Sequence, residues 1–195
     1  MRNITLVLIL FALVSCAHAP NRSELDAIGK ELIAMKDVDQ EARRRWLKDQ
    51  TNKALDDEVE AIDARNTARL LEIIKRVGGW PGKSMVGEKA SGAAWTLAQH
   101  AEGSVLRELL PVMERAVKHQ ELDGALYATS FDRVRILDGK KQLYGSQFDT
   151  KGDKCEPMPV EDPEHLDERR IAIGLGPIAD YAKQLCDVYK GSKKP

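Results

Sequence analysis

A helical periodicity that runs through most of the chain constrains its fold more than any other feature. Between residues 54 and 77, apolar side chains recur at helical spacing, on the stripe Leu55, Val59, Ile62, Leu70, Ile73 and Val77. This spacing puts them on one face of an α-helix, and the pair Gly78-Gly79 ends it. Comparable stripes predict helices over about 86–101, 105–117, 123–137, 163–173 and 177–190. With 5% aromatic and 31% charged residues, the chain suits a helical domain with solvated outer faces.

Start and stop signals in the sequence predict the bounds of the first two helices. Ser23 begins a helix that runs to about Lys36. Asp37 and Gln40 then have the spacing of a capping box, which predicts a second helix. That helix is expected to break near residues 51–52, and the helix from 105 to be kinked or restarted at Pro111.

The period changes only near the C-terminal third of the chain. Residues 142–148 alternate like a strand, and residues 155–160 return as a short edge strand limited by prolines. The prediction is a mainly α, single multi-helix domain over residues 23–190 with one small β-hairpin near residues 142–160. A loose tail follows at 191–195. No internal repeat or shift in composition marks a second domain.

The N-terminus reads as an export signal. Arg2 supplies a positive start, and Ile4 to Val14 is an almost wholly apolar run of 11 residues. As a helix this run rises only about 16 Å, against roughly 30 Å for a bilayer core. Its length and basic flank therefore predict a signal peptide over residues 1–15 in place of a membrane span.

The run ends in Leu13-Val14-Ser15-Cys16, which resembles the lipobox of bacterial lipoproteins. The resemblance implies cleavage before Cys16, lipid on that cysteine and a lipidated tether over residues 16–22. The chain would be a lipid-anchored protein of the cell envelope. Ala17 favours the outer membrane, facing the periplasm, in a Gram-negative host. Cleavage after the A-x-A match at residues 17–19 and an uncleaved cytoplasmic N-terminus are the alternatives.

Charge and motif content exclude several classes of function. Removal of residues 1–15 takes away one arginine and no acid, so the net charge changes from −1 to −2. Nucleic-acid binding needs a clustered basic surface, so no nucleic acid is expected as a partner. The histidines at 18, 100, 119 and 165 form no metal-binding spacing. We therefore expect no metal and no cofactor. The partner is the membrane, through the lipid, with an unidentified protein or envelope component.

Three cysteines are present. With Cys16 lipidated, Cys155 and Cys186 remain as a pair. An oxidising envelope permits a disulfide between them, and the alternative is two separate thiols. A structural bridge is the prediction.

Several polar residues stand where the helical stripes call for apolar ones. They are Asp39, Gln40 and Arg43, Asp63 and Asn66, Gln99 and His100, and Asp132 and Arg133. A polar group buried without a partner costs roughly 1–3 kcal/mol, so each needs one. One interpretation is a set of internal bonds that fix how the helices dock. The other is convergence of several of these side chains on one pocket.

A set of short motifs covers about residues 30–190. They are Asp39-Gln40-x-x-Arg43, Gly79-Trp80-Pro81, Ala94-Trp95-x-x-x-Gln99-His100-Ala101, Asp132-Arg133-Val134 and Tyr144-Gly145-Ser146-Gln147. Together they resemble an uncharacterised family of bacterial domains, which often has Thr in place of Ser146. The resemblance implies a domain identity and no reaction. It places Trp80, Gln99, His100, Asp132, Arg133, Tyr144 and Gln147 in the family pattern.

Two functional hypotheses follow. The first is a helical binding or accessory domain that recognises an envelope component. The second is an envelope hydrolase or transferase with His100 as general acid or base, since histidine is the side chain whose ordinary pKa lies nearest neutrality. Asp132 would orient His100, while Arg133, Gln147 and Tyr144 would hold a polar or anionic substrate, with Trp80 and Gln99 as further ligand-binding candidates. A water-accessible pocket at His100 would favour the enzyme, and a sealed His100 the structural interpretation.

Overall fold

The computed structural model describes residues 19–150 and 154–192. The predicted signal peptide (1–15), the lipidation site Cys16 and the end of the tail (193–195) lie outside these residues. The helices are α1 (Arg22–Lys48), α2 (Lys53–Val77), α3 (Lys83–Val86), α4 (Glu88–His100), α5 (Gly103–Lys118), α6 (Gly124–Leu137), η1 (Pro163–His165), α7 (Leu166–Ala172) and α8 (Ile178–Ser192). The strands are β1 (Phe148–Asp149) and β2 (Glu156–Pro157). The domain is mainly α with one small hairpin, as predicted.

Helix α1 is a single helix where the sequence predicted two. Asn21 caps its start by accepting a hydrogen bond from the backbone N–H of Glu24 at 3.0 Å. The predicted break at Asp37 does not occur, because residues 30–42 contain no glycine or proline to end the helix. Asp37 and Gln40 have capping-box spacing inside a continuous helix. The Asp39–Arg43 segment therefore lies in the middle of α1.

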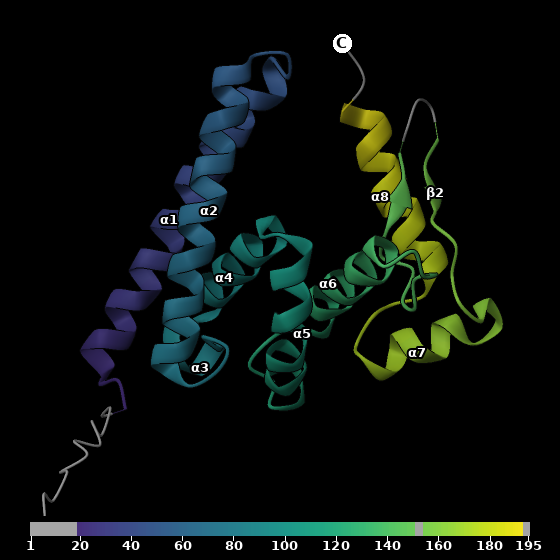
Figure 1. The fold of residues 1–195 in the computed structure, drawn as a ribbon. Coiled ribbons are helices and arrows are strands. Elements are labelled where there is room, and N and C mark those ends of the chain that lie inside the picture. Colours follow the sequence, from purple (N-terminus) through teal and green to yellow (C-terminus); the bar gives the residue numbers. More distant parts are fainter. Residues whose placement is uncertain (1–18, 151–153, 193–195) are drawn as a thin grey trace, which may run out of the picture.

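Helices α1 and α2 form a long antiparallel hairpin (Figure 1). Ion pairs across the hairpin mark its register, including Arg76 with Glu24 and Arg45 with Glu58. Helix α2 ends at Gly78, which adopts φ +75°. That left-handed conformation suits glycine, because it has no Cβ to clash. The predicted end of this helix is confirmed.

A polar layer divides the apolar core of the hairpin. On one side, Ala42, Val59 and Ile62 pack with Trp46. On the other, the main core includes Leu32 and Leu70. The layer between them contains buried Asp39 and buried Asn66, whose side-chain amide makes no hydrogen bond to the described residues. Polar groups are thus concentrated at mid-hairpin.

The small residues of α4 let it pack closely against its neighbours. Its buried face consists mainly of Ala90, Ala93, Ala94, Leu97 and Ala98. Helix α5 continues through Pro111 as one helix, so the restart expected at this proline does not occur. The side chain of Trp95 joins α4 to α6, because its Nε1 donates to the carbonyl of Leu126 at 2.8 Å and to Ser130 Oγ at 3.0 Å. These bonds hold α4 beside α6.

The segment expected to be a strand at 142–148 is mostly a loop. Its backbone N–H groups at Leu143, Tyr144 and Ser146 donate to the carboxylate of Asp132, at 2.7–3.2 Å. Donors used in this way cannot form a strand ladder, so the ordered pairing is limited to an isolated bridge at Gln142 and the two-residue β1. β1 pairs antiparallel with β2. The predicted hairpin is present, but its strands are shorter than the alternating sequence pattern indicated.

The C-terminal helix is held to the hairpin by a disulfide. Cys155 and Cys186 are bridged, with their Cα atoms 5.7 Å apart. The predicted pairing is therefore present. The ring of Tyr181 packs edge-on against Phe148, with centroids 5.7 Å apart. Helix α8 thus lies along the hairpin (Figure 1).

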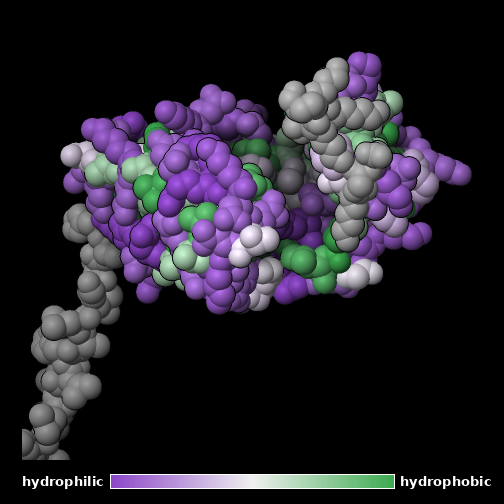
Figure 2. All heavy atoms as spheres, turned by 90° about the horizontal axis from the view of Figure 1, so that it is seen from above, coloured by the Kyte–Doolittle hydropathy of each residue, from purple (hydrophilic) through white to green (hydrophobic). Residues whose placement is uncertain are grey.

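Hydrophilic side chains dominate the face seen from above, with separate small patches of apolar ones (Figure 2). Within residues 19–150 and 154–192, no helix combines the length and apolar character needed to cross a bilayer.

Candidate functional site

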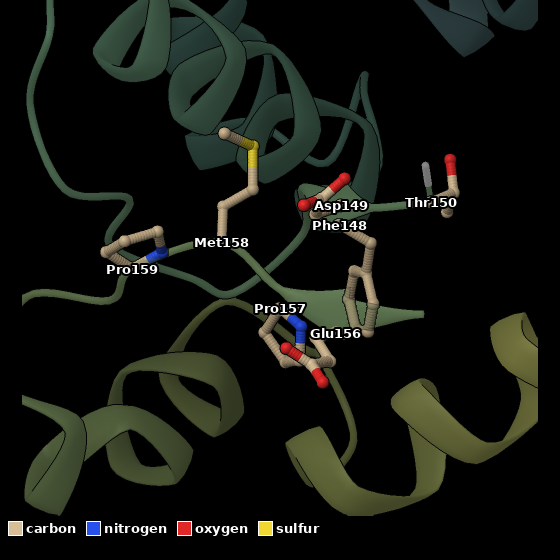
Figure 3. A pocket seen from close by; sticks show the side chains of 7 residues that line it. All are labelled: Phe148, Asp149, Thr150, Glu156, Pro157, Met158 and Pro159. Atoms are coloured by element: carbon tan, nitrogen blue, oxygen red, sulfur yellow. The ribbon is translucent and has the colours of Figure 1, made fainter. Parts of the chain in front are cut away.

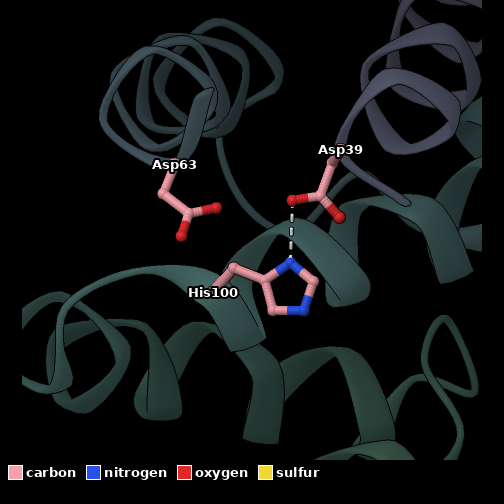
Figure 4. A group of neighbouring side chains, drawn as sticks. All are labelled: Asp39, Asp63 and His100. Atoms are coloured by element: carbon pink, nitrogen blue, oxygen red, sulfur yellow. Dashed lines mark hydrogen bonds and ion pairs between the residues drawn. The ribbon is translucent and has the colours of Figure 1, made fainter. Parts of the chain in front are cut away.

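His100 and Asp39 meet where the end of α4 reaches the middle of α1. His100 Nδ1 lies 3.0 Å from Asp39 Oδ1. The Asp39 side chain is 1% exposed and that of His100 is 20% exposed. The carboxylate is therefore sealed in the protein while the imidazole still reaches solvent. Figure 4 shows the ring lying below the two carboxylates, with Nδ1 directed at Asp39.

Two side chains face Nδ1 of His100. Arg43 Nε donates to Nδ1 at 3.1 Å and to Asp39 Oδ1 at 3.2 Å, and Asp39 Oδ1 itself lies 3.0 Å from Nδ1. In the tautomer with its hydrogen on Nδ1, the ring donates to Asp39 and keeps a lone pair on Nε2, whereas in the other tautomer Nδ1 accepts from Arg43 and Nε2 carries the hydrogen. In both tautomers Nε2 is the ring nitrogen that Arg43 and Asp39 leave unused.

The Nε2 atom is open. It makes no hydrogen bond within the part of the chain that the structure describes, and it is not among the sealed unpaired atoms. The ring edge that carries it is turned away from both carboxylates in Figure 4. An imidazole held at Nδ1 and free at Nε2 can exchange a proton with a bound molecule.

Asp63 on α2 completes the group from a third helix. Arg43 Nη2 donates to both of its carboxylate oxygens, at 2.5 and 2.7 Å. Burial raises the pKa of Asp63, and the ion pair with Arg43 offsets this only in part. Burial acts on Asp39 in the same direction, but hydrogen bonds from His100 and Gln40 outweigh it and hold the pKa of Asp39 below its ordinary range. The two carboxylates are thus pushed in opposite directions, a pattern found where acid and base roles are divided.

Beside this group lies a groove of about 830 Å³. Helix α2 forms one wall, with Glu60, Asp63, Ala64, Thr67, Ala68 and Leu71, and the α4–α5 connection forms the other, with His100, Ala101, Glu102 and Val105. Asp63 and His100 therefore belong both to the charged group and to a concave surface.

The same residues could contact a metal ion. Asp39, Asp63 and His100 each offer one ligand atom, and these atoms lie within 4.8 Å of one another. Nitrogen and oxygen ligands of this kind suit zinc or manganese. However, the guanidinium of Arg43 bonds to both carboxylates, so a divalent ion would have to displace it. The set fits a metal only with Arg43 moved aside.

Arg133 lies close to this group from α6. Gln99 Nε2 donates to Ser130 Oγ at 2.6 Å, and Arg133 follows Ser130 by three residues, which places it on the same helix face. Its side chain is exposed, and partial loss of water around the guanidinium, together with the charge of Arg43, lowers the pKa of Arg133. Within the described residues, no hydrogen bond or ion pair of Arg133 is found.

The sequence suggested that Asp132 orients His100. The structure does not pair these two residues. Asp132 is completely buried and binds the 143–146 loop, including the hydroxyl of Ser146 at 2.9 Å. Asp39 holds the position next to His100 that had been expected for Asp132. The physical reason is that Asp132 faces backbone donors which satisfy its carboxylate.

The other sequence candidates are spread over the domain. Tyr144 packs against Phe131 beside the Asp132 loop, and Gln147 Nε2 donates to the carbonyl of Thr129 at 3.2 Å. Trp80 is buried, and its Nε1 donates to Ser91 Oγ at 3.2 Å. These contacts support the fold. Of the predicted set, His100, Gln99 and Arg133 lie near the charged group, and Asp132, Tyr144 and Gln147 form a second group around the loop.

A second pocket, of about 560 Å³, lies against the strand pair (Figure 3). It is lined by Phe148, Asp149, Thr150, Glu156, Pro157, Met158 and Pro159. Among the described residues, its lining holds no histidine or cysteine, and its acids are Asp149 and Glu156. The groove beside His100 therefore offers a histidine for acid–base chemistry, which the described lining of this second pocket does not.

Sequence reasoning named Asp39, Arg43 and Asp63 as polar interruptions of helical stripes but did not join them to His100. The i, i+4 spacing of Asp39 and Arg43 on one helix was the available signal. The contacts to α2 and α4 depend on how three helices pack, which periodicity does not specify.

Comparison with known proteins adds one match. The sequence model of a family of unknown function, DUF6624, matches residues 26–194. No curated protein and no solved structure matches the chain.

Proposed function

The chain belongs to DUF6624, a family of unknown function, and we propose from the site itself that it is an acid–base enzyme of the cell envelope, anchored by lipid on Cys16. In this proposal His100 is the general acid or base, and Asp39 orients it. The observation that carries the proposal is the His100–Asp39 pair: a sealed carboxylate binds Nδ1 and leaves Nε2 open beside a groove.

The chemistry is hydrolysis or group transfer. Nε2 of His100 takes a proton from the attacking water, or from a hydroxyl group in a transferase. It then gives that proton to the leaving group. A buried anionic partner stabilises the imidazolium formed between these steps. General acid–base catalysis by such a group contributes about 10²- to 10⁴-fold in rate.

A pair of variants tests this role. His100→Ala should reduce the hydrolysis of a chromogenic ester or phosphodiester by at least about 100-fold. The probes are p-nitrophenyl acetate and bis(p-nitrophenyl) phosphate, and release of nitrophenolate is the measurement. His165→Ala is the matched control, because His165 also bonds an aspartate, Asp162, at 3.0 Å but on the exposed surface.

The expected result is turnover by the wild type and by His165→Ala, with loss in His100→Ala. Equal turnover in the wild type and His100→Ala would contradict the proposal. Failure of the wild type to hydrolyse either probe would count against it as well.

A binding domain is the second candidate. The observation in its favour is that Arg43 forms ion pairs with both Asp39 and Asp63. The charges of the two carboxylates are then already balanced within the protein. A pure binding site would keep its affinity in His100→Gln, because that substitution retains a polar side chain without the proton chemistry of imidazole.

A further inference from the structure

One face of α2 forms a wall of the groove beside His100. The lining residues of this helix recur at helical spacing over about three turns, and they are Glu60, Asp63, Ala64, Thr67, Ala68 and Leu71. The middle of this stripe has small side chains, at Ala64, Thr67 and Ala68. Longer side chains at these positions would fill the groove. Its volume of about 830 Å³ lies within the range of small-molecule binding sites.

The charge of the groove beside His100 is negative. Glu60 lies one turn before Asp63 on α2, and Glu102 follows His100 by two residues on the opposite wall. Among the described residues, the lining contains no lysine or arginine. Arg43 pairs with Asp63 but is not one of the lining residues. A cationic ligand would therefore be attracted to the part of the groove next to His100, and an anion would be repelled.

Apolar side chains continue the groove along α2. Leu71 is 39% exposed although it is a large apolar residue. It lies eight residues beyond Asp63, a rise of about 12 Å along the helix. Val105 adds apolar surface from α5. The groove thus combines carboxylates beside the open nitrogen of His100 with apolar surface farther along, which fits a ligand with a cationic group joined to an apolar part.

We propose that this groove binds a substrate with a primary ammonium group joined to an apolar segment. The ammonium group would lie at Glu60 and Glu102, and the apolar segment along Ala68 and Leu71. The proposal rests on the function proposed for His100 and names the substrate class of that same site. An ammonium group is a compact charge with three donors, so it can bond to carboxylates on two walls.

Three six-carbon probes separate the effect of charge from that of apolar contact: hexylammonium, 1-hexanol and hexanoate. Each is titrated into the full chain, and the backbone amide NMR resonances of Ala64 and Ala101, which line the groove, are followed. Hexylammonium should give saturable shifts. 1-Hexanol should bind at least about fivefold more weakly, because each ion pair at an exposed carboxylate adds up to about this factor in affinity. Hexanoate should give no saturable shift.

Variants assign the binding to the groove. The double variant of Glu60→Gln and Glu102→Gln should weaken hexylammonium at least about fivefold and leave the affinity for 1-hexanol unchanged, since it removes charge alone. Glu164→Gln is the matched control, because Glu164 is an exposed glutamate of η1 outside the groove. It should bind like the wild type. Ala68→Leu fills the groove from an exposed position and should weaken both probes.

The outcomes separate the two proposals. Equal binding of the three probes, an unchanged affinity for hexylammonium in the double variant, or no saturable shift would overturn the ammonium site. Hexylammonium binding that persists in His100→Gln, together with no hydrolysis of the ester probes, would leave the ammonium site intact and refute the acid–base function. Hydrolysis that requires His100 but is not inhibited by hexylammonium would refute the ammonium site and leave the acid–base function in place.

Discussion

At the scale of single residues, the site combines two aspartates with opposite tendencies. Hydrogen bonds hold the pKa of Asp39 low, and burial holds the pKa of Asp63 high. The sequence marked both as polar interruptions but assigned His100 to Asp132. Asp39, Asp63 and Asp132 all fit the helical pattern equally well. Which of them bonds His100 depends on the hydrogen-bond donors that face each carboxylate in the folded protein.

These shifts predict opposite pH effects on stability. Asp39 favours the folded state above its ordinary pKa of 3.8, and that contribution is lost as the pH falls through its lower folded-state pKa. The stability lost in Asp39→Asn should therefore shrink as the pH falls below about 4. Asp63 has a raised folded-state pKa, so its contribution is present below 3.8 and is lost as the pH rises through the folded value. Asp63→Asn should gain stability relative to the wild type as the pH rises from 3.8.

Urea unfolding of the two variants and the wild type at several pH values between 3 and 7 measures both slopes. Parallel pH profiles for Asp39→Asn and Asp63→Asn would show that the two carboxylates are not held in different environments.

At the scale of elements, periodicity located most helices correctly. The stripes over residues 54–77 and 123–137 became α2 and α6, because glycine or an aspartate-glycine pair ended each of them. Two of the errors have a common cause. A helix start at Asp37 and a strand at 142–148 were inferred from local spacing, while a continuous α1 and the Asp132 carboxylate determined the outcome.

The disulfide predicts a measurable effect on one element. Cys155 and Cys186 are 31 residues apart. Replacing both with serine should lower the free energy of unfolding by about 3–4 kcal/mol on the chain-entropy model. Chemical denaturation checks this, and peptide mapping without reductant should recover the cross-linked peptide from envelope-derived protein. A double variant as stable as the wild type would show that the bridge adds nothing to stability.

At the scale of the whole molecule, lipid anchoring remains a prediction from the sequence. Cys16→Ala should abolish incorporation of labelled palmitate, because the acylated side chain is removed. The Cys155→Ser variant is the matched control and should label normally. Palmitate retained in Cys16→Ala would contradict the lipoprotein assignment.

The continuity of α1 sets a limit on where the protein can work. If lipid holds Cys16 at the bilayer, the six residues to Arg22 span at most about 22 Å. Asp39 lies 17 residues further along α1, a rise of about 26 Å. The site then stands no more than about 48 Å above the membrane by these two lengths, whatever the tilt of the hairpin. Its ligand must therefore come within a few nanometres of the lipid surface, which excludes any target confined to the distant side of a wide periplasm.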